Sequence, residues 1–151
     1  MSRVRYSALA VVTVPHQGKR SRFYFSVYPH NVRSEQVVLL LEHLLRLIPG
    51  HIVLVWDNAP IHRAKVVNEF LRAHKRLHIE ELPSYAPELN PVENSWAQMK
   101  FHHLGNFTPY DPEELYRTIQ VSAQRIRVRP KLCSSFLKGG PLTWKSENHF
   151  L

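Results

Sequence analysis

The stretch "HIVLVWDNAPIHRAKVVNEFL", residues 51–71, joins a short apolar run to a single aspartate, a proline and a second run with helical spacing. A continuous apolar run such as 51–56 is typical of a strand buried on both faces. The apolar residues of the second run predict a helix over 63–76. A strand, a turn and a helix in this order indicate an α/β fold.

The rest of the chain repeats this alternation. The pattern predicts strands over 5–14 and 22–28 that form a hairpin, then a helix over 34–48 whose N-cap is Ser34. A weaker strand over 77–82 and helices over 91–100 and 111–127 follow. We therefore expect a sheet containing parallel strands, flanked by helices.

Composition favours one domain and a polyanionic partner. The chain has 151 residues, is 44% hydrophobic and has a formal net charge of +8. Residues 1–33 hold six basic and no acidic residues, whereas 34–99 hold six basic and eight acidic residues. Carboxylates in the middle of a basic chain are expected where an acidic site is surrounded by a surface that holds phosphates.

The cysteine count and the apolar stretches indicate the compartment. Cys133 is the only cysteine, which excludes a disulfide within the chain and a cysteine-based zinc cluster. The longest apolar stretch, residues 37–48, carries charged side chains and is too short to cross a bilayer. With no signal-peptide pattern, we expect a cytoplasmic, nucleoid-associated protein with no membrane partner.

Two carboxylates stand out by their positions. Asp57 ends a predicted strand, and Glu93 lies in the first turn of the helix after the next strand. If the two strands are neighbours, both carboxylates meet at one sheet edge and offer oxygen ligands suited to Mg²⁺ or Mn²⁺. Two other interpretations remain open: Asp57 can be a turn residue, and Glu93 can close a capping box with Asn90, as Glu114 can with Asp111.

A resemblance favours the metal site. The segments "VLVWDNAPIHRAKVVNEFL" (53–71) and "LPSYAPELNPVENSWAQMK" (82–100) resemble the catalytic core of insertion-sequence transposases of the mariner superfamily, the DDE endonucleases. The resemblance runs from about Val4 to Phe136. It implies a ribonuclease-H-like mixed sheet flanked by helices, with a catalytic domain at 1–138 and a tail at 139–151.

The resemblance also implies the roles of individual residues. Asp57 corresponds to the second catalytic aspartate and Glu93 to the glutamate, which together would bind divalent ions, two in an intact site, for DNA cleavage and strand transfer. The same signature includes Asn58, His62, Asn90, Asn94, Trp96 and Lys100. We expect Asn58, His62, Asn90 and Asn94 beside the site. Trp96 shares a helical face with Val92 and Met99, so we expect it in the core.

One departure from the family pattern concerns the first catalytic aspartate, which the family carries on the first strand of the sheet. The acidic residues before Asp57 are Glu35 and Glu42, and both fall in a predicted helix. We therefore expect a domain truncated at its N-terminus that lacks this first strand. The truncation can reflect a frameshifted second reading frame, a fragment or a decayed remnant. Such a chain would cleave DNA weakly by itself and would act as a homodimer or with an upstream transposase segment.

Other side chains support DNA binding more than further chemistry. We expect phosphate contacts from Lys100, Arg125, Arg127, Arg129 and Lys131, with Trp144 and Lys145 nearby. His74 and His78 are four positions apart, a spacing that zinc can use, and His102 and His103 follow the third predicted helix, but surface histidines explain all four better. Two function classes remain: a DNA-cleaving and strand-joining enzyme domain, and a non-catalytic DNA-binding or dimerising remnant that inhibits an intact transposase.

Overall fold

The computed structural model describes residues 5–14, 19–105, 111–142 and 144. Its elements are, in chain order, β1 (Ser7–Val12), β2 (Phe23–Tyr28), α1 (Ser34–Leu47), β3 (Ile52–Trp56), the 3₁₀ turn η1 (Pro60–Arg63), α2 (Lys65–Ala73), β4 (Leu77–Glu81), the 3₁₀ turn η2 (Pro87–Leu89), α3 (Val92–Gln98), the π-helical turn η3 (Met99–His103), α4 (Pro112–Arg127) and α5 (Pro130–Lys138). In the described part of the chain, no helix is long and apolar enough to span a bilayer.

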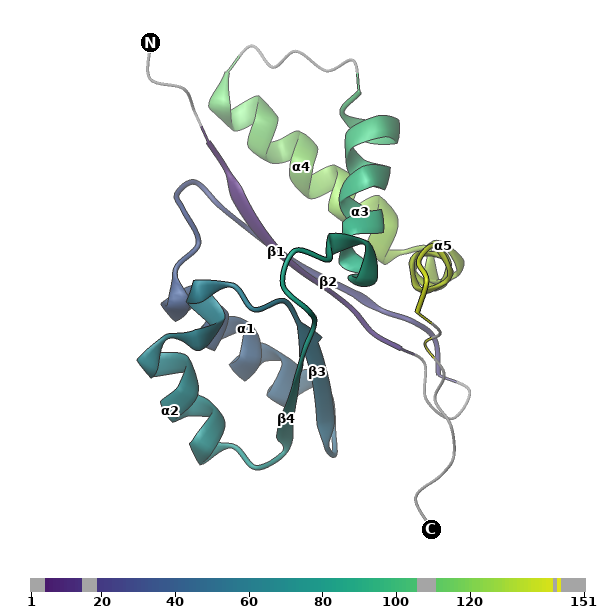
Figure 1. Cartoon of the computed structure of the whole chain (residues 1–151). Coiled ribbons are helices and arrows are strands. Elements are labelled where there is room, and N and C mark those ends of the chain that lie inside the picture. Colours follow the sequence, from purple (N-terminus) through teal and green to yellow (C-terminus); the bar gives the residue numbers. More distant parts are fainter. Residues whose placement is uncertain (1–4, 15–18, 106–110, 143, 145–151) are drawn as a thin grey trace.

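The described strands form two sheets of two strands each. β1 and β2 are antiparallel, from Ser7 opposite Tyr28 to Val12 opposite Phe23, which confirms the predicted hairpin. β3 and β4 are parallel, so the two strands expected to be neighbours are indeed paired. Figure 1 shows the β1–β2 hairpin crossing the middle of the molecule. The helices α1 and α2 lie with β3 and β4 on one side of it, and α3, α4 and α5 lie on the other.

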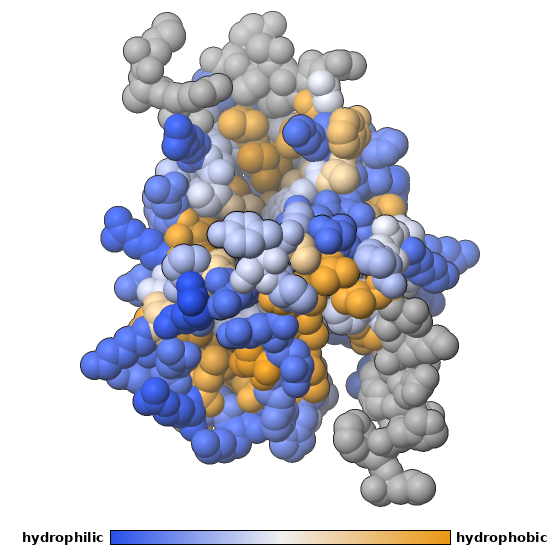
Figure 2. Space-filling model, viewed as in Figure 1, coloured by the Kyte–Doolittle hydropathy of each residue, from blue (hydrophilic) through white to orange (hydrophobic). Residues whose placement is uncertain are grey.

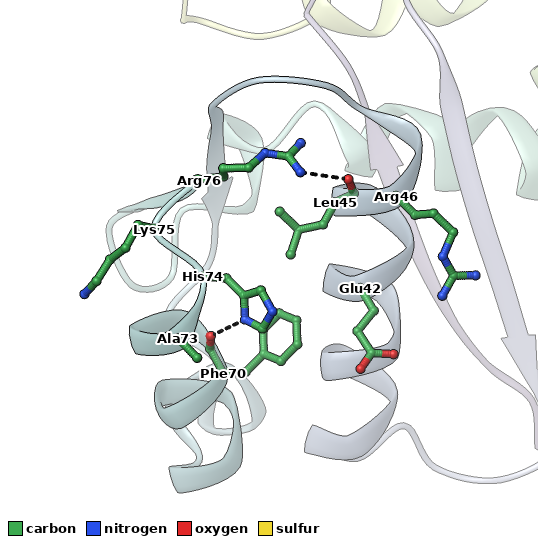
Figure 3. A pocket seen from close by; sticks show the side chains of 8 residues that line it. All are labelled: Glu42, Leu45, Arg46, Phe70, Ala73, His74, Lys75 and Arg76. Carbon is green, nitrogen blue, oxygen red and sulfur yellow. Dashed lines mark hydrogen bonds between the residues drawn. The ribbon is translucent and has the colours of Figure 1, made fainter.

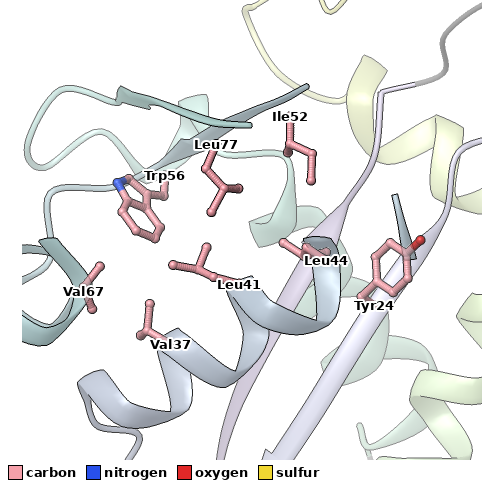
Figure 4. Close-up of a cluster of buried hydrophobic side chains, with 8 residues drawn as sticks. All are labelled: Tyr24, Val37, Leu41, Leu44, Ile52, Trp56, Val67 and Leu77. Carbon is pink, nitrogen blue, oxygen red and sulfur yellow. The ribbon is translucent and has the colours of Figure 1, made fainter. Parts of the chain in front are cut away.

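The first hydrophobic core lies between α1, α2 and the β3–β4 sheet (Figure 4). The α1 side chains point at the strands because apolar residues recur along one face of this helix. Eight buried residues form this core: Tyr24, Val37, Leu41, Leu44, Ile52, Trp56, Val67 and Leu77. The hairpin contributes to it through Tyr24.

The second core lies on the other side of the hairpin, against α4 and α5. Its buried residues are Phe23, Met99, Ala123, Ile126, Cys133 and Phe136. Because successive residues of a strand point to opposite faces, Phe23 enters this core while its neighbour Tyr24 enters the first. The hairpin is therefore a wall that the two cores share. Trp96 packs against the second core, with its ring 5.9 Å from that of Phe25, which confirms its predicted place in the core.

Arg76 ties α1 to the start of β4. Its Nε donates to the carbonyl of Gly50 at 2.7 Å, and its other guanidinium nitrogens donate to the carbonyls of Leu45 and Ile48. Figure 3 shows the bond to Leu45. The carbonyls of Leu45 and Ile48 belong to the last turn and the C-cap of α1, where the helix itself supplies no donors, so Arg76 satisfies them.

Three sequence-based expectations about elements were wrong. Ser34 is not the N-cap of α1: the cap is Arg33, whose N–H donates to the Gln36 side chain at 2.8 Å. β3 is not buried on both faces, since Val53 is 64% exposed. The helix predicted over 63–76 is confined to Lys65–Ala73, because Ala64 is extended and separates it from η1.

The first core generates a stability prediction. Replacing fully buried Leu41 with alanine leaves a cavity and should lower the free energy of unfolding by about 2–5 kcal/mol. Leu39 lies on the same helix but is 54% exposed, so Leu39→Ala should change the free energy by no more than about 0.5 kcal/mol. Urea unfolding followed by circular dichroism measures both, and equal losses would contradict the assignment of this core.

Candidate active site

Asp57 lies immediately after β3, at the edge where the parallel strands end. The pairing continues one step beyond β4, because the N–H of Leu82 donates to the carbonyl of Trp56 at 2.8 Å. This hydrogen bond fixes the backbone at Trp56, the residue directly before Asp57. The Asp57 side chain remains 59% exposed, so it can still reach a ligand from solvent.

His62 holds Asp57 in place. Its Nδ1 lies 2.9 Å from the Asp57 carbonyl oxygen and 3.0 Å from the Asp57 Oδ1 atom. Because both neighbours are acceptors, Nδ1 must carry the proton and donate. The ring stacks on Trp56 at 4.2 Å with an interplanar angle of 4°, and the Ala59 N–H donates to Asp57 Oδ1 at 3.2 Å. His62 therefore contacts Asp57 directly. The role of Trp56 was not predicted, since its only signal in the sequence is an aromatic residue at a strand end.

Glu93 is presented by the first turn of α3, and its carboxylate does not form the capping box. The N–H of Asn90, which such a box would use, instead donates to the Pro87 carbonyl at 3.0 Å. The Asn90 side chain accepts from the Val92 N–H at 3.1 Å, and the α3 N-cap is Pro91. The capping interpretation of Glu93 is therefore wrong, whereas Asp111 does cap α4 by accepting from the Glu114 N–H at 2.7 Å.

Asn94 anchors the helix that carries Glu93. Its Nδ2 donates to the carbonyl of Phe136 at 2.8 Å, which ties α3 to α5. A Cβ added at Gly139 would come within 2.8 Å of that Nδ2, so a glycine leaves room for this contact. Asn94 thus lies next to the site residue in sequence but acts on the orientation of α3.

The loop that leads to Glu93 contains an unusual backbone conformation. Tyr85 has a φ of 59°, a left-handed value that non-glycine residues adopt infrequently, and its side chain is fully exposed. The chain thereby turns from the end of β4 back toward α3. The turn lies in the connection between β4 and α3, the helix that carries Glu93.

The two carboxylates interact electrostatically. Asp57 and Glu93 line the same groove. Partial desolvation, and next the negative charge of Asp57, raise the pKa of the Glu93 carboxyl above its usual range although the side chain is exposed. The structure therefore brings together the two residues that the spacing pointed to.

The donor set suits a hard divalent cation. Asp57 and Glu93 supply carboxylate oxygens, and the buried Oδ1 of Asn58, next to Asp57, has no hydrogen-bond partner in the described part of the structure. Magnesium is commonly held by one or two carboxylates together with substrate phosphates. Among the described residues, no group of three His, Cys, Asp or Glu side chains is arranged to hold a metal ion.

The histidines considered for zinc have other partners. His74 stacks on Phe70 at 3.9 Å and its Nδ1 lies 2.7 Å from the Phe70 carbonyl oxygen, as Figure 3 shows. His78 lies with its Nε2 2.9 Å from the Nδ1 of His51. The His74–His78 spacing therefore does not form a shared site. The side chain of His103 and the whole of Lys145 lie outside the described residues.

The predicted DNA-binding residues are all exposed. Lys100 lies on η3, Arg125 and Arg127 on the last turn of α4, Arg129 between α4 and α5, and Lys131 on the first turn of α5. Both η3 and α5 pack against α4, so these cations belong to one group of neighbouring elements. These cations therefore lie on elements on the side of the hairpin that also carries α3.

The sequence profile described as "DDE superfamily endonuclease" matches residues 5–115. No match is found among curated protein sequences.

Solved structures show the same fold. The crystal structure of the catalytic domain of Mos1 mariner transposase is similar with a TM-score of 0.54 and 14% identity, over 88% of this chain and 80% of that chain. The Mos1 strand transfer complex gives 0.51 and 15%, over 85% of this chain and 46% of that one. The Mos1 catalytic domain with raltegravir and Mg gives 0.51 and 15%, over 91% and 84%. At these identities the likeness establishes the fold, which is the predicted one.

The His62 contacts generate a prediction. His62→Ala removes a stacked ring and a hydrogen bond to Asp57, and should lower the free energy of unfolding by about 1–2 kcal/mol. Arg63 is exposed on the same turn, and Arg63→Ala should have an effect within about 0.5 kcal/mol. Chemical denaturation of both variants measures these changes. A loss of unfolding free energy in Arg63→Ala as large as in His62→Ala would contradict a specific stabilising role of the His62 contacts.

Glu93 generates a pH-dependent prediction. A carboxyl whose pKa is raised by folding binds its proton more tightly in the native than in the unfolded state, so stability falls as the pH rises from the usual pKa through the raised one. Glu93→Gln should therefore stabilise the ion-free protein near neutral pH, by at most about 1 kcal/mol because water reaches the group. The free energy of unfolding, measured at about pH 4 and about pH 7, should be higher for Glu93→Gln than for the native chain only at about pH 7. An advantage that is constant or larger at low pH would show that folding does not raise the pKa of Glu93.

Proposed function

The chain belongs to the DDE superfamily of endonucleases, and on this basis we propose that it is a transposase catalytic domain that cleaves DNA and joins strands with divalent metal ions. The observation that carries the proposal is the meeting of Asp57 and Glu93. They come from opposite sides of the hairpin, line one groove, and lie close enough for one charge to raise the pKa of the other. A repulsive carboxylate pair is costly in a site without function, and a cation relieves that cost.

Asp57 and Glu93 would hold the cation through their carboxylate oxygens in the groove that both residues line. When bound, a divalent ion supplies positive charge that stabilises a reacting phosphodiester and favours deprotonation of the attacking hydroxyl. Solved Mos1 catalytic domains with raltegravir and Mg or Mn share this fold, which supports the choice of Mg²⁺ or Mn²⁺.

The residues of this chain set the conditions for that chemistry. His62 orients Asp57 through its Nδ1–H, and Trp56 keeps the His62 ring from rotating by stacking on it. Asn94 fixes the helix of Glu93. Such partners of a ligating residue commonly contribute 10-fold to 100-fold to metal affinity or activity, so about that loss is expected on their removal. Because Glu93 holds its proton more tightly than usual, cation binding competes with protonation and weakens as the pH falls.

DNA is the proposed partner, and the basic surface formed by Lys100, Arg125, Arg127, Arg129 and Lys131 is proposed to bind its phosphates. These side chains are exposed and can contact a backbone, which supplies affinity without sequence preference. Structures of Mos1 include a strand transfer complex and a paired-end complex with the left transposon end. Those assemblies support DNA as the ligand of this fold.

The alternative function is DNA binding without cleavage. With two carboxylates the cation is held less tightly than by three, so we propose that the chain by itself cleaves weakly. The proposed basic surface belongs to α4, α5 and η3, whereas Asp57 and His62 lie between β3 and α2. DNA binding would therefore survive the loss of DNA cleavage. In that case the protein would act as an inhibitor that occupies DNA or forms mixed assemblies with an intact transposase.

Nicking of supercoiled plasmid in Mg²⁺ or Mn²⁺ tests the catalytic proposal. Removing a carboxylate that holds the ion costs several kcal/mol of transition-state stabilisation, so Asp57→Asn and Glu93→Gln should each lower nicking by at least about 100-fold. Glu88→Gln is the matched control, since Glu88 is an exposed carboxylate five positions before Glu93. DNA affinity, measured by fluorescence anisotropy, should stay nearly constant in all three variants.

The outcomes separate the two functions. Nicking that persists in Asp57→Asn would sink the catalytic assignment. If the native chain binds DNA but shows no metal-dependent nicking, and the variants bind DNA with the same affinity, the function without cleavage is favoured. Replacement of Arg125 and Arg127 by alanine should weaken DNA binding in both cases and reduce its dependence on salt concentration.

A further inference from the structure

Two exposed histidines meet at the start of the β3–β4 sheet, away from the candidate active site. His51 comes directly before β3, and His78 is the second residue of β4. The Nδ1 of His51 lies 2.9 Å from the Nε2 of His78, and the centres of the two rings are 5.1 Å apart. Asp57 follows the other end of β3, six residues after His51, which corresponds to about 20 Å along a strand. The histidine pair is therefore separate from the site at Asp57.

The register of the parallel sheet brings the two rings together on its outer face. Val53 is paired with His78, and His51 lies two residues before Val53. Because residues two apart along a strand share a face, the side chains of all three point the same way. Ile52 and Leu77 point into the first core, whereas Val53 is 64% exposed, so this face is the outer one. Figure 2 shows hydrophobic side chains at the surface over β3 and β4, bordered by hydrophilic ones.

The distance between the two nitrogens is close to that of two ligands of one metal ion. A tetrahedral zinc ion holds imidazole nitrogens at about 2.0–2.1 Å, which places two of them about 3.3 Å apart. At similar bond lengths, adjacent corners of a square-planar copper or nickel ion are about 2.9 Å apart. The observed separation is 2.9 Å, and both side chains are exposed and free to rotate by the few tenths of an ångström that zinc requires.

We propose that His51 and His78 bind one divalent ion of the late transition metals, the class of Zn²⁺ and Cu²⁺, with water in its remaining positions. Imidazole suits these ions, whereas Mg²⁺ prefers carboxylate and carbonyl oxygens, so this site and the carboxylate site select different metals. The ion bridges the beginnings of β3 and β4 and thereby stabilises the sheet that ends at Asp57. This role does not require that the chain cleaves DNA.

Proton positions in the pair are compatible with this binding. In the hydrogen bond between the two neutral rings, one of the facing nitrogens donates its proton and the other accepts it. When the ion binds, the proton of the donating ring moves through water to the other nitrogen of the same ring. Both rings then remain neutral, each presents one electron pair to the metal, and no net proton is released.

The charges around the pair favour a cation. Glu80 is exposed and follows His78 by two positions, so it places a carboxylate on the same face of β4. Arg76 is a cation near the start of the same strand, but its guanidinium donates to three backbone carbonyls at the end of α1 and directly before His51. With two protein ligands instead of the four of a structural zinc site, we expect a readily reversible site.

Calorimetric titration of the whole untagged chain with Zn²⁺ tests the proposal, in an excess of Mg²⁺ that competes for the carboxylate site. We expect one zinc site per chain that is tighter than any other. His51→Ala and His78→Ala each remove one of two ligands and should weaken this site by at least about tenfold. His30→Ala is the matched control, because His30 is an exposed histidine whose Nδ1 contacts the Asn31 carbonyl, and it should leave the zinc affinity unchanged.

Two further measurements identify the ligands and the effect of the ion. Electron paramagnetic resonance of the chain with one equivalent of Cu²⁺ should show two coordinating imidazoles in the native protein and one in either variant. An ion that binds the folded state stabilises it, so Zn²⁺ at roughly 100 times its dissociation constant should raise the Tm of the native chain by about 5 °C or more. Neither variant should gain this increase.

The variants also show which results would overturn the proposal. Both histidines are exposed, so both alanine variants should fold, which circular dichroism verifies; His51→Gln or His78→Gln replaces a variant that does not. The proposal is overturned if the native chain binds zinc no more tightly than the two variants do. It is also overturned if Asp57→Asn, and neither histidine change, removes the zinc site, because the ion would then belong to the carboxylates.

Discussion

The alternation of side chains along β2 is the constraint on which the structure depends. Phe23 enters the core against α4 and α5, and the next residue, Tyr24, enters the core against α1. A strand in which one face is apolar can support only one core, whereas this hairpin is apolar on both faces and supports two. The first side carries β3 and hence Asp57, and the other carries α3 and hence Glu93. The relation between the two carboxylates therefore depends on the hairpin between them.

The site is locally unfavourable and is held by contacts around it. Partial desolvation and, after it, the negative charge of Asp57 act against ionised Glu93, and a buried oxygen of Asn58 has no described partner. The stack of His62 on Trp56 fixes the segment that contains Asp57, and the hydrogen bond from Asn94 to the Phe136 carbonyl fixes the helix that contains Glu93. Proteins commonly sacrifice local stability at a functional site and recover it elsewhere. This distribution explains why the site residues include two, His62 and Asn94, whose contacts are with the protein itself.

The open edges of β1 and β3 follow from the same arrangement. The two sheets are related through the cores and the connecting helices, while their facing edges share no hydrogen bonds. The fold is nevertheless that of the mariner catalytic domain, because packing between helices and sheets fixes the positions of the strands. Edge pairing and helix packing are thus separable in this chain.

The sequence by itself predicted most of the strands and helices and singled out Asp57 and Glu93, because the signals for them lie between near neighbours in the chain. The apolar run before Asp57, the cap at Asp111 and the resemblance around Glu93 all belong to this kind. Only the tertiary structure decided that Glu93 is free of a capping box, since the competing acceptor for the Asn90 N–H is the Pro87 carbonyl. It also decided that Val53 is exposed and that α5, which was not predicted from the sequence, anchors α3. These outcomes depend on which groups come into contact, and which strand faces stay exposed, when segments distant in sequence pack together. The spacing of residues along the chain does not determine those contacts.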